Sequence, residues 1–259
     1  MKLGVNIDHI AVLREARKIA DPNPLDALGI LKRAGADQIT IHLREDRRHI
    51  QDSDARAIIE HAPLPVNLEC AMAKEIIDIV YELQPHRVTL VPEKREEVTT
   101  EGGLNILGEQ DHLIETIQRL QSQEIEVSLF IDPTLDNIER SKTLGVEWIE
   151  FHTGKYANIY AMLYGNLGKT HHCIDTLDLS RKTLKEMLEE ELTTLRVLSC
   201  DAMEMGLKVA AGHGLNYQNV EAIAQIETIE ELNIGQSIIA RSIWVGLEQA
   251  ILDMRLLLS

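Results

Sequence analysis

Short apolar runs recur along the chain, and nearly every run ends in polar residues that can do chemistry. Stretches with apolar residues at helical spacing separate the runs. Parallel α/β folds bind ligands at the carboxyl ends of their strands, so this asymmetry predicts strands that converge on one site. The pattern predicts a single α/β domain over residues 1–259, a (β/α)8 TIM barrel with extra helices. The eight runs are 3–9, 38–46, 66–69, 88–94, 127–132, 148–154, 208–214 and 232–236.

The stretches between the runs predict helices. Ser53 is a plausible N-cap for one of them, and the last is expected to be one long helix. The stretch between the sixth and seventh strands is too long for a single helix. We therefore expect an insertion around 155–181 that forms a lid, a subunit contact or a flexible loop. The expected helices are 24–34, 53–61, 73–83, 111–122, 136–144, 179–205, 217–224 and 236–258.

Composition narrows the class of protein. Hydrophobic residues make up 44% of the chain and aromatic residues only 3%, so the core, including the barrel interior, is expected to be mostly Leu, Ile, Val and Ala. The formal net charge is -16, which argues against nucleic acid and anionic membranes as partners. No apolar run approaches the roughly 20 residues of a membrane helix. The N-terminus enters a strand directly, which leaves no room for a signal peptide. The three cysteines are scattered along the chain and predict free thiols in the cytoplasm.

The ends of the first two strands carry candidate ligand-binding residues. Asn6 and Asp8 share one face of the first strand by its period of two, although Asp8 could equally cap the following helix. His42 and Arg44 share a face of the second strand, and a guanidinium there suits a phosphorylated or carboxylated substrate. His49 lies in the same cluster.

Carboxylates at strand ends are candidates for proton transfer. Glu69 ends a strand in a partly apolar setting that would raise its pKa, or it forms an ion pair with Arg44. Glu150 lies inside the sixth strand. Its carboxylate either faces the catalytic mouth of the barrel or is paired with another polar group there. His152 shares its face and is either catalytic or a hydrogen-bonded core histidine. Segment 145–152 resembles segment 35–42, half a barrel away, and both deliver a His near the strand's end.

The seventh and eighth strands end in glycine-rich turns. His213 is flanked by glycines that leave its imidazole unhindered. Loops after these strands commonly bind phosphate in such barrels, and the eighth leads into the last helix at Gly235 and Gln236. The loop that contains Thr99 is either a closing loop or plain solvated chain. The chain shows no clear metal triad and no strand-end lysine suited to a Schiff base, so neither a metal nor a cofactor is expected.

Six segments together resemble the pyridoxine 5'-phosphate synthase family, the ring-closing enzymes of the deoxyxylulose-phosphate route to vitamin B6. They span the chain, and the arginine cluster in combination with the VTTEGG loop is highly specific. They are GVNIDHIA (4–11), HLREDRRHI (42–50), VPEKREEVTTEGGL (91–104), VSLFID (127–132), AGHGL (211–215) and ELNIG (231–235).

The resemblance implies two phosphorylated substrates, 1-deoxy-D-xylulose 5-phosphate and 3-amino-2-oxopropyl phosphate. It implies a barrel with extra helices that assembles as a homo-octamer, a tetramer of dimers. His42 and Glu69 would be proton acceptors, His213 a proton donor, and Glu150 would stabilise a transition state. By motif, the residues that would bind deoxyxylulose phosphate are Asp8, His9, Arg44, His49 and Thr99. Those that would bind the amino ketone phosphate are Asn6, Arg17, Gly214, Gly235 and Gln236.

Two features depart from the family pattern. Gln236 stands where a His is expected, and a Gln amide donates to phosphate without charge or titration. The stretch 155–178 looks long, which favours an enlarged lid or oligomer contact. Two rival functions are a metal-dependent phosphosugar epimerase and a catalytically idle barrel that senses phosphorylated metabolites.

Overall fold

Eight parallel strands close into a barrel in which each strand pairs with its sequence neighbours and β8 pairs with β1. This computed structural model describes residues 1–93, 102–107 and 110–259. The predicted TIM barrel is confirmed. The strands are β1 (Lys2–Asn6), β2 (Gln38–His42), β3 (Val66–Cys70), β4 (Arg87–Leu90), β5 (Glu126–Ile131), β6 (Trp148–His152), β7 (Lys208–Gly212) and β8 (Glu231–Ile234).

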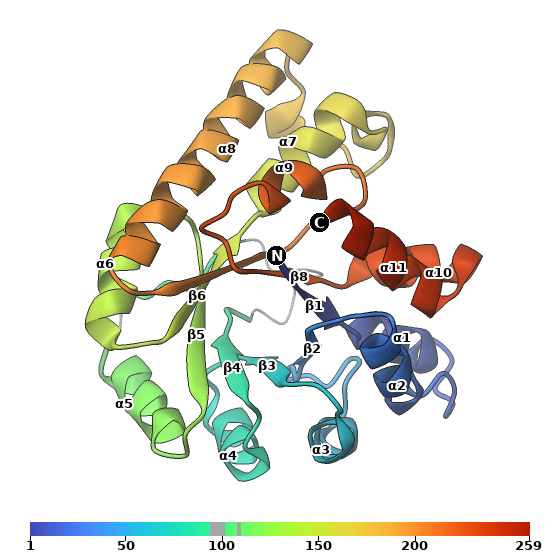
Figure 1. Ribbon diagram of the computed structural model, residues 1–259, viewed down its shortest axis with the longest axis vertical. Helices are drawn as coiled ribbons and strands as arrows, with labels where there is room; N and C mark the ends of the chain where they lie inside the picture. The colour runs from blue at the N-terminus through green and yellow to red at the C-terminus, as the bar shows by residue number, and fades with distance from the viewer. Residues whose placement is uncertain (94–101, 108–109) are drawn as a thin grey trace.

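Helices surround the barrel (Figure 1). Several lie where periodicity predicts them, because each presents an apolar face to the sheet. The α-helices are α1 (Asp8–Glu15), α2 (Leu28–Arg33), α3 (Asp52–His61), α4 (Lys74–Leu83), α5 (Gln110–Gln121), α6 (Leu135–Leu144), α7 (Gly154–Tyr164), α8 (Arg181–Glu204), α9 (Val220–Ala224), α10 (Gln236–Val245) and α11 (Leu247–Leu257). Three short 3-10 turns are η1 (Pro24–Ala27), η2 (Leu167–Lys169) and η3 (Asp175–Leu177).

Two local expectations about the helices are wrong. Helix α3 begins one residue before Ser53, and its N-cap is Gln51, whose N–H donates to the Asp54 carboxylate (2.9 Å). The final segment is two helices, because Gly246 adopts φ 82° and so turns the chain between α10 and α11. A glycine takes this left-handed conformation without the steric cost that a side chain adds.

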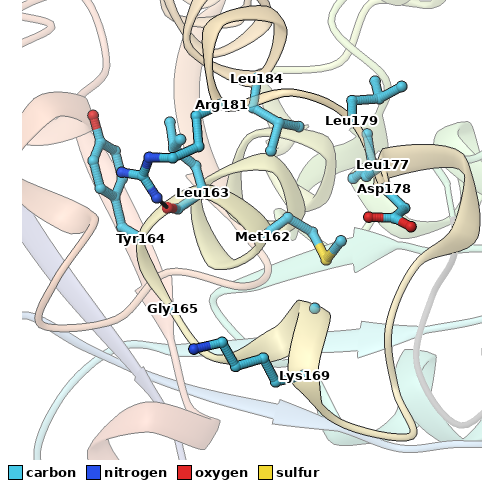
Figure 2. A pocket seen from close by; sticks show the side chains of 11 residues that line it. Met162, Leu163, Tyr164, Gly165, Lys169, Leu177, Asp178, Leu179, Arg181 and Leu184 are labelled. Carbon is cyan, nitrogen blue, oxygen red and sulfur yellow. Dashed lines mark hydrogen bonds between the residues drawn. The ribbon is translucent and has the colours of Figure 1, made fainter.

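The stretch between β6 and β7 contains α7, η2, η3 and the long helix α8. Helices α7 and α8 pack side by side (Figure 1). Between them and the two 3-10 turns lies a cavity of about 350 Å³, whose lining includes Met162, Tyr164 and Lys169 (Figure 2). The guanidinium of Arg181 reaches across to donate to the Leu163 carbonyl (2.6 Å).

The barrel interior is polar, which contradicts the expected aliphatic filling. The Arg87 guanidinium donates to Glu231 (2.8 Å), although β4 and β8 lie on opposite sides of the barrel. Gln38 donates to the same carboxylate (3.0 Å), and Thr40 donates to the Asn233 side chain (3.1 Å). Because successive side chains alternate across a strand, the aliphatic residues of the same strands face the helices and form the core there.

Among the residues that the structure describes, no helix is both long enough and apolar enough to cross a lipid bilayer.

The interior charge pair leads to a prediction about stability. Arg87→Met leaves the buried Glu231 carboxylate without its cation, and breaking such a pair costs about 3–5 kcal/mol. We expect a clear fall in the urea midpoint. Lys182→Met is the control, because its pair with Glu186 is exposed and should contribute no more than about 1 kcal/mol. Equal destabilisation by the two variants would contradict the assignment of Arg87 as the structural cation.

Candidate active site

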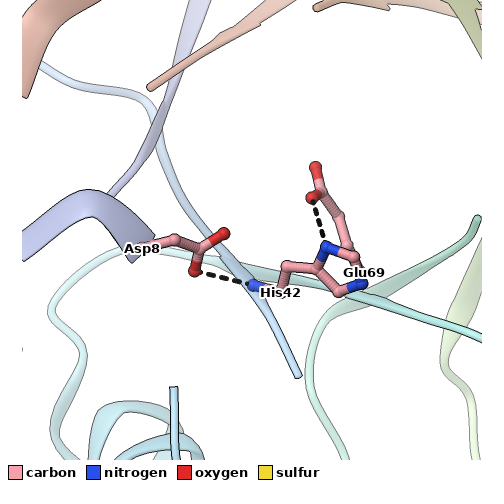
Figure 3. A group of neighbouring side chains, drawn as sticks. All are labelled: Asp8, His42 and Glu69. Carbon is pink, nitrogen blue, oxygen red and sulfur yellow. Dashed lines mark hydrogen bonds and ion pairs between the residues drawn. The ribbon is translucent and has the colours of Figure 1, made fainter. Parts of the chain in front are cut away.

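Three predicted site residues meet at the carboxyl end of the barrel. Asp8, His42 and Glu69 follow or end the neighbouring strands β1, β2 and β3, and their side chains converge (Figure 3). The Asp8 carboxylate accepts from the backbone N–H of His42 (2.9 Å) and from the Asn6 amide (2.8 Å). Its side chain does not cap α1, whose N-cap is Ile7. Asp8 therefore fixes the positions of Asn6 and His42.

His42 lies between two carboxylates. Its Nδ1 is 3.9 Å from Glu69 Oε2, and its Nε2 is 2.7 Å from Glu93 Oε1. The neighbour of Glu69 is thus His42, while Arg44 contacts Asp46 (3.2 Å). A His held between two acidic groups can accept a proton on one side while the other side stabilises the charge.

Glu93 is a site residue that sequence reasoning missed. Its carboxylate also accepts from the backbone N–H of Glu45 (3.1 Å), so it joins the loop after β2 to the loop after β4. Burial opposes ionisation, but the hydrogen bond and charge of His42 hold the pKa of Glu93 below its usual value. The available signal was its place three residues beyond the end of β4, the kind of position that marked Glu69 and Asp8.

Two carboxyl groups in the site, the buried Glu150 and the half-buried Glu69, have raised pKa values. Burial raises the pKa of Glu69 well above its ordinary value, and the charges of Glu150 and Asp8 raise it further. Burial also raises the pKa of Glu150 to about 7, against a hydrogen bond from the Asn233 amide (2.8 Å), and the charge of Glu231 adds to the rise. Carboxyl groups with such pKa values can exchange protons near neutral pH.

His213 and His152 form a pair on the opposite side of the barrel mouth. His152 Nε2 is 2.9 Å from His213 Nδ1, and His152 Nδ1 is 3.2 Å from Asp132 Oδ1. Burial, with a smaller contribution from the neighbouring His152, lowers the pKa of His213 to about 4. His213 has φ 82°, an uncommon conformation for a residue with a side chain. Both ring nitrogens of His152 are thus hydrogen-bonded, as one of its two expected alternatives required.

The remaining imidazoles of the predicted site are also buried. Burial lowers the pKa of His9 and of His49, although Asp8 opposes both changes. His49 is fixed by the N–H of Ile50, which donates to its Nδ1 (2.9 Å). Arg44 is buried beside it in the loop after β2. These side chains offer neutral donors and one cation for a phosphate.

The glycines of the predicted phosphate loops are required by close packing. A Cβ on Gly235 would lie 2.8 Å from Asn6 Cβ, and one on Gly214 would lie 2.5 Å from Ala157 Cβ. Two further predicted residues, Arg17 and Gln236, are exposed, the first after α1 and the second at the start of α10. Thr99 lies outside the described residues.

The described residues contain one group that could hold a cation. One ligand atom each of Asp8, His42 and Glu69 lies within 4.8 Å of the others (Figure 3). A divalent ion needs these carboxylates ionised, and the raised pKa of Glu69 moves that requirement to higher pH.

A family model described as pyridoxal phosphate biosynthesis protein PdxJ matches residues 3–259. The chain belongs to the PdxJ family. A pyridoxine 5'-phosphate synthase of Sulfurovum sp. is 74% identical over 258 residues, covering 100% of both chains. The enzyme of the same name from Aliarcobacter butzleri is 66% identical over 255 residues, covering 98% of each.

Solved structures support the fold alone. A phosphoribosyl anthranilate isomerase from Thermococcus kodakaraensis superposes with a TM-score of 0.59 at 11% identity, over 99% of this chain and 97% of that one. The KGPDC of Streptococcus mutans superposes with a TM-score of 0.60 at 10% identity, over 99% and 96%.

The coupling of the two carboxyl groups can be tested by pH dependence. Glu150→Gln removes a negative charge that raises the pKa of Glu69, so Glu69 should stay ionised to lower pH. If Glu69 is the base, the acidic limb of kcat/KM should move to lower pH, even though kcat falls. Glu139→Gln on the exposed face of α6 is the control. An unmoved acidic limb in Glu150→Gln would show that the limb belongs to another group.

Proposed function

We infer that this chain is a pyridoxine 5'-phosphate synthase. It condenses 3-amino-2-oxopropyl phosphate with 1-deoxy-D-xylulose 5-phosphate and releases phosphate and water. The observation that carries this inference is the convergence of His42, Glu69, Glu150 and His213 on one barrel mouth, in a chain that matches the family over nearly its whole length.

The two substrates bind on different sides of this mouth. Deoxyxylulose phosphate lies against the loops after β1 and β2, near Asp8, His9, Arg44 and His49, and the family motif assigns Thr99 to the same substrate. The amino ketone phosphate lies against the turns after β7 and β8. There Gly214 and Gly235 let the backbone approach a phosphate closely, and the N-terminus of α10 favours an anion. Asn6, Arg17 and Gln236 complete this side; Arg17, Gln236 and Thr99 rest on the family motif alone.

Proton transfers then drive ring closure. The amine of one substrate and the ketone of the other form an imine, so no enzyme lysine is needed. Glu69 and His42 accept protons from the joined substrates as phosphate leaves. His213 returns a proton to an oxygen that departs as water, and Glu150 stabilises the charge of the transition state.

The protein also fits a cytoplasmic homo-octamer, a tetramer of dimers. Cys70, Cys173 and Cys200 are free thiols, as expected in a reducing compartment. Helices α1 and α10 pack together, and they expose the apolar side chains of Val12, Leu13, Ile243 and Trp244, which a second copy of the chain would cover.

The deciding experiment is synthesis by purified, chelator-treated protein. Both substrates are supplied, with the unstable amino ketone generated in place, and mass spectrometry follows pyridoxine 5'-phosphate and released phosphate. Product without metal supports the synthase. Activity that disappears on chelation and returns with a divalent ion supports the rival metal-dependent barrel, for which Asp8, His42 and Glu69 are the candidate ligands. Tight binding of deoxyxylulose phosphate without turnover supports a sensor.

Glu69 is expected to contribute acid–base catalysis. Glu69→Gln should lower kcat by roughly 100-fold or more, because a positioned acid or base contributes at least about that factor. Glu82→Gln, on the exposed face of α4, is the matched control and should keep the kcat of the unmodified protein. Unchanged turnover in Glu69→Gln would remove Glu69 from the mechanism.

Gln236 is expected to make binding of the amino ketone phosphate insensitive to pH. Gln236→His adds an imidazole that becomes cationic below about pH 6.5. The apparent KM for that substrate should then fall on acidification from pH 8 to pH 6 by a few-fold more than in the Gln236→Asn control. The same KM profile in both variants would place residue 236 away from the phosphate.

Trp244 is expected to lie in a contact between copies. Its side chain is 85% exposed in the single chain, an unusual state for a large aromatic residue. Trp244→Glu should therefore yield a smaller assembly by analytical ultracentrifugation. Val197→Glu on α8, at a residue 52% exposed, is the control. An intact octamer with Trp244→Glu would place the contact elsewhere.

A further inference from the structure

The imidazole of His213 is the end of a hydrogen-bonded chain that starts at a carboxylate. Asp132, which follows β5, contacts His152 Nδ1, and His152 Nε2 contacts His213 Nδ1. The carboxylate itself is fixed, since Asp132 Oδ1 also accepts from the backbone N–H of Gly103 (3.0 Å). The three side chains come from the ends of three consecutive strands.

The direction of each hydrogen bond follows from the carboxylate. An ionised carboxylate only accepts, so the proton of neutral His152 lies on Nδ1. His152 Nε2 then carries a lone pair and accepts from Nδ1–H of His213. The opposite arrangement would turn the His152 Nδ1 lone pair toward the Asp132 oxygen, which is repulsive.

We propose that Asp132 and His152 are positioning residues that hold His213 in its Nδ1–H tautomer, with Nε2 left as the atom that exchanges a proton with the substrate. This inference rests on the proposed role of His213 and deepens it. The resting His213 cannot donate from Nε2, so it first accepts a proton there from the joined substrates and becomes imidazolium. It then returns that proton to the departing hydroxyl oxygen, which leaves as water.

Burial and His152 lower the pKa of His213, so its imidazolium is a transient form and the groups around the pair matter. When His213 takes up a proton at Nε2, its Nδ1–H donates a stronger hydrogen bond to His152. The positive charge of the imidazolium is then separated from the Asp132 carboxylate only by the His152 ring. Among the described residues, the other charged groups near His152 are Glu191 on α8, which opposes the lowering of its pKa by burial, and Lys155, which pairs with Glu191 (2.6 Å). The Phe130 ring packs against both imidazoles, with ring centroids 5.2 Å from His152 and 6.3 Å from His213.

Gly154 leaves the space in which the side chains of His152 and His213 contact each other. A Cβ at this position would lie 2.5 Å from His152 Nε2 and 3.2 Å from His213 Nδ1, the two atoms that form the hydrogen bond. Gly154 starts α7, where Ala is otherwise the better helix former. The backbone is held by Thr153, whose hydroxyl contacts the carbonyls of Gly212 and His213 (both 2.7 Å).

The parallel with His42 supports a shared design. Segments 35–42 and 145–152 are alike in sequence, and each ends a strand with a His. In both cases one ring nitrogen contacts a carboxylate from the end of another strand, Glu93 for His42 and Asp132 for His152. The two histidines differ in their other neighbour, which is Glu69 for His42 and His213 for His152.

The test combines nitrogen NMR with kinetics on the full-length protein. In protein labelled with 15N-histidine at pH 7.5, His213, assigned by loss of its signals in His213→Gln, should show a protonated Nδ1 and an unprotonated Nε2. Asp132→Asn, whose amide can donate to His152, should move the His213 proton to Nε2 in a substantial fraction of molecules. An Nε2–H tautomer in the unmodified protein overturns the proposal, whatever the enzyme's activity.

Kinetics provide the second measurement. Asp132→Asn should lower kcat by roughly 10-fold or more with little change in KM, as expected for an interaction that matters only in the transition state. Gly154→Ala should also lower kcat, because the added Cβ separates the rings of His152 and His213. Asp136→Asn in the first turn of α6 is the matched control and should keep the original kcat. Unchanged kcat in both Asp132→Asn and Gly154→Ala overturns the positioning role of Asp132 and His152. Absence of product in the unmodified protein refutes the proposed function, and the NMR result then decides the tautomer by itself.

Discussion

Polar side chains fill the barrel interior, and the hydrogen bonds between them link the base of the barrel to the site. Arg87 neutralises Glu231 across the barrel, and Gln38 donates to the same carboxylate. One layer higher, Asn233 accepts from Thr40 and donates to Glu150. Because an unpaired buried polar group is costly, each layer fixes the next. The charge of Glu231 also helps to set the pKa of Glu150.

Burial pushes the acids and the bases of the site toward their neutral forms. The pKa values of Glu69 and Glu150 are raised, while those of His9, His49, His152 and His213 are lowered. Carboxyl groups whose pKa is raised can exchange protons near neutral pH, and imidazoles whose pKa is lowered stay neutral and able to accept a proton. A reaction that moves several protons and expels phosphate and water needs such groups on more than one side of the substrate. The two histidines that face carboxylates, His42 and His152, lie on opposite sides of the mouth.

Much of the site was predictable because strand ends are visible in sequence. Alternation along a strand placed Asn6 beside Asp8, and apolar runs showed where Glu69, Glu150 and His213 would emerge. Glu93 and Asp132 were missed as partners, since their roles depend on which loops meet over the barrel mouth. The aliphatic interior was wrongly expected because both faces of a barrel strand are buried. Composition then cannot tell which face looks inward, and here the aliphatic face packs on the helices.

By itself the sequence determined the order of the strands, the chemistry at each strand end and, through its motifs, the family. These properties are local, since they depend on periodicity and on residues adjacent in the chain. Only the tertiary structure decided which titratable groups share a hydrogen bond, which way each histidine is oriented and how far burial displaces each pKa. Those properties depend on distances between residues far apart in the chain, such as Glu150 and Asn233 or Asp132 and His152, and closure of the barrel sets those distances.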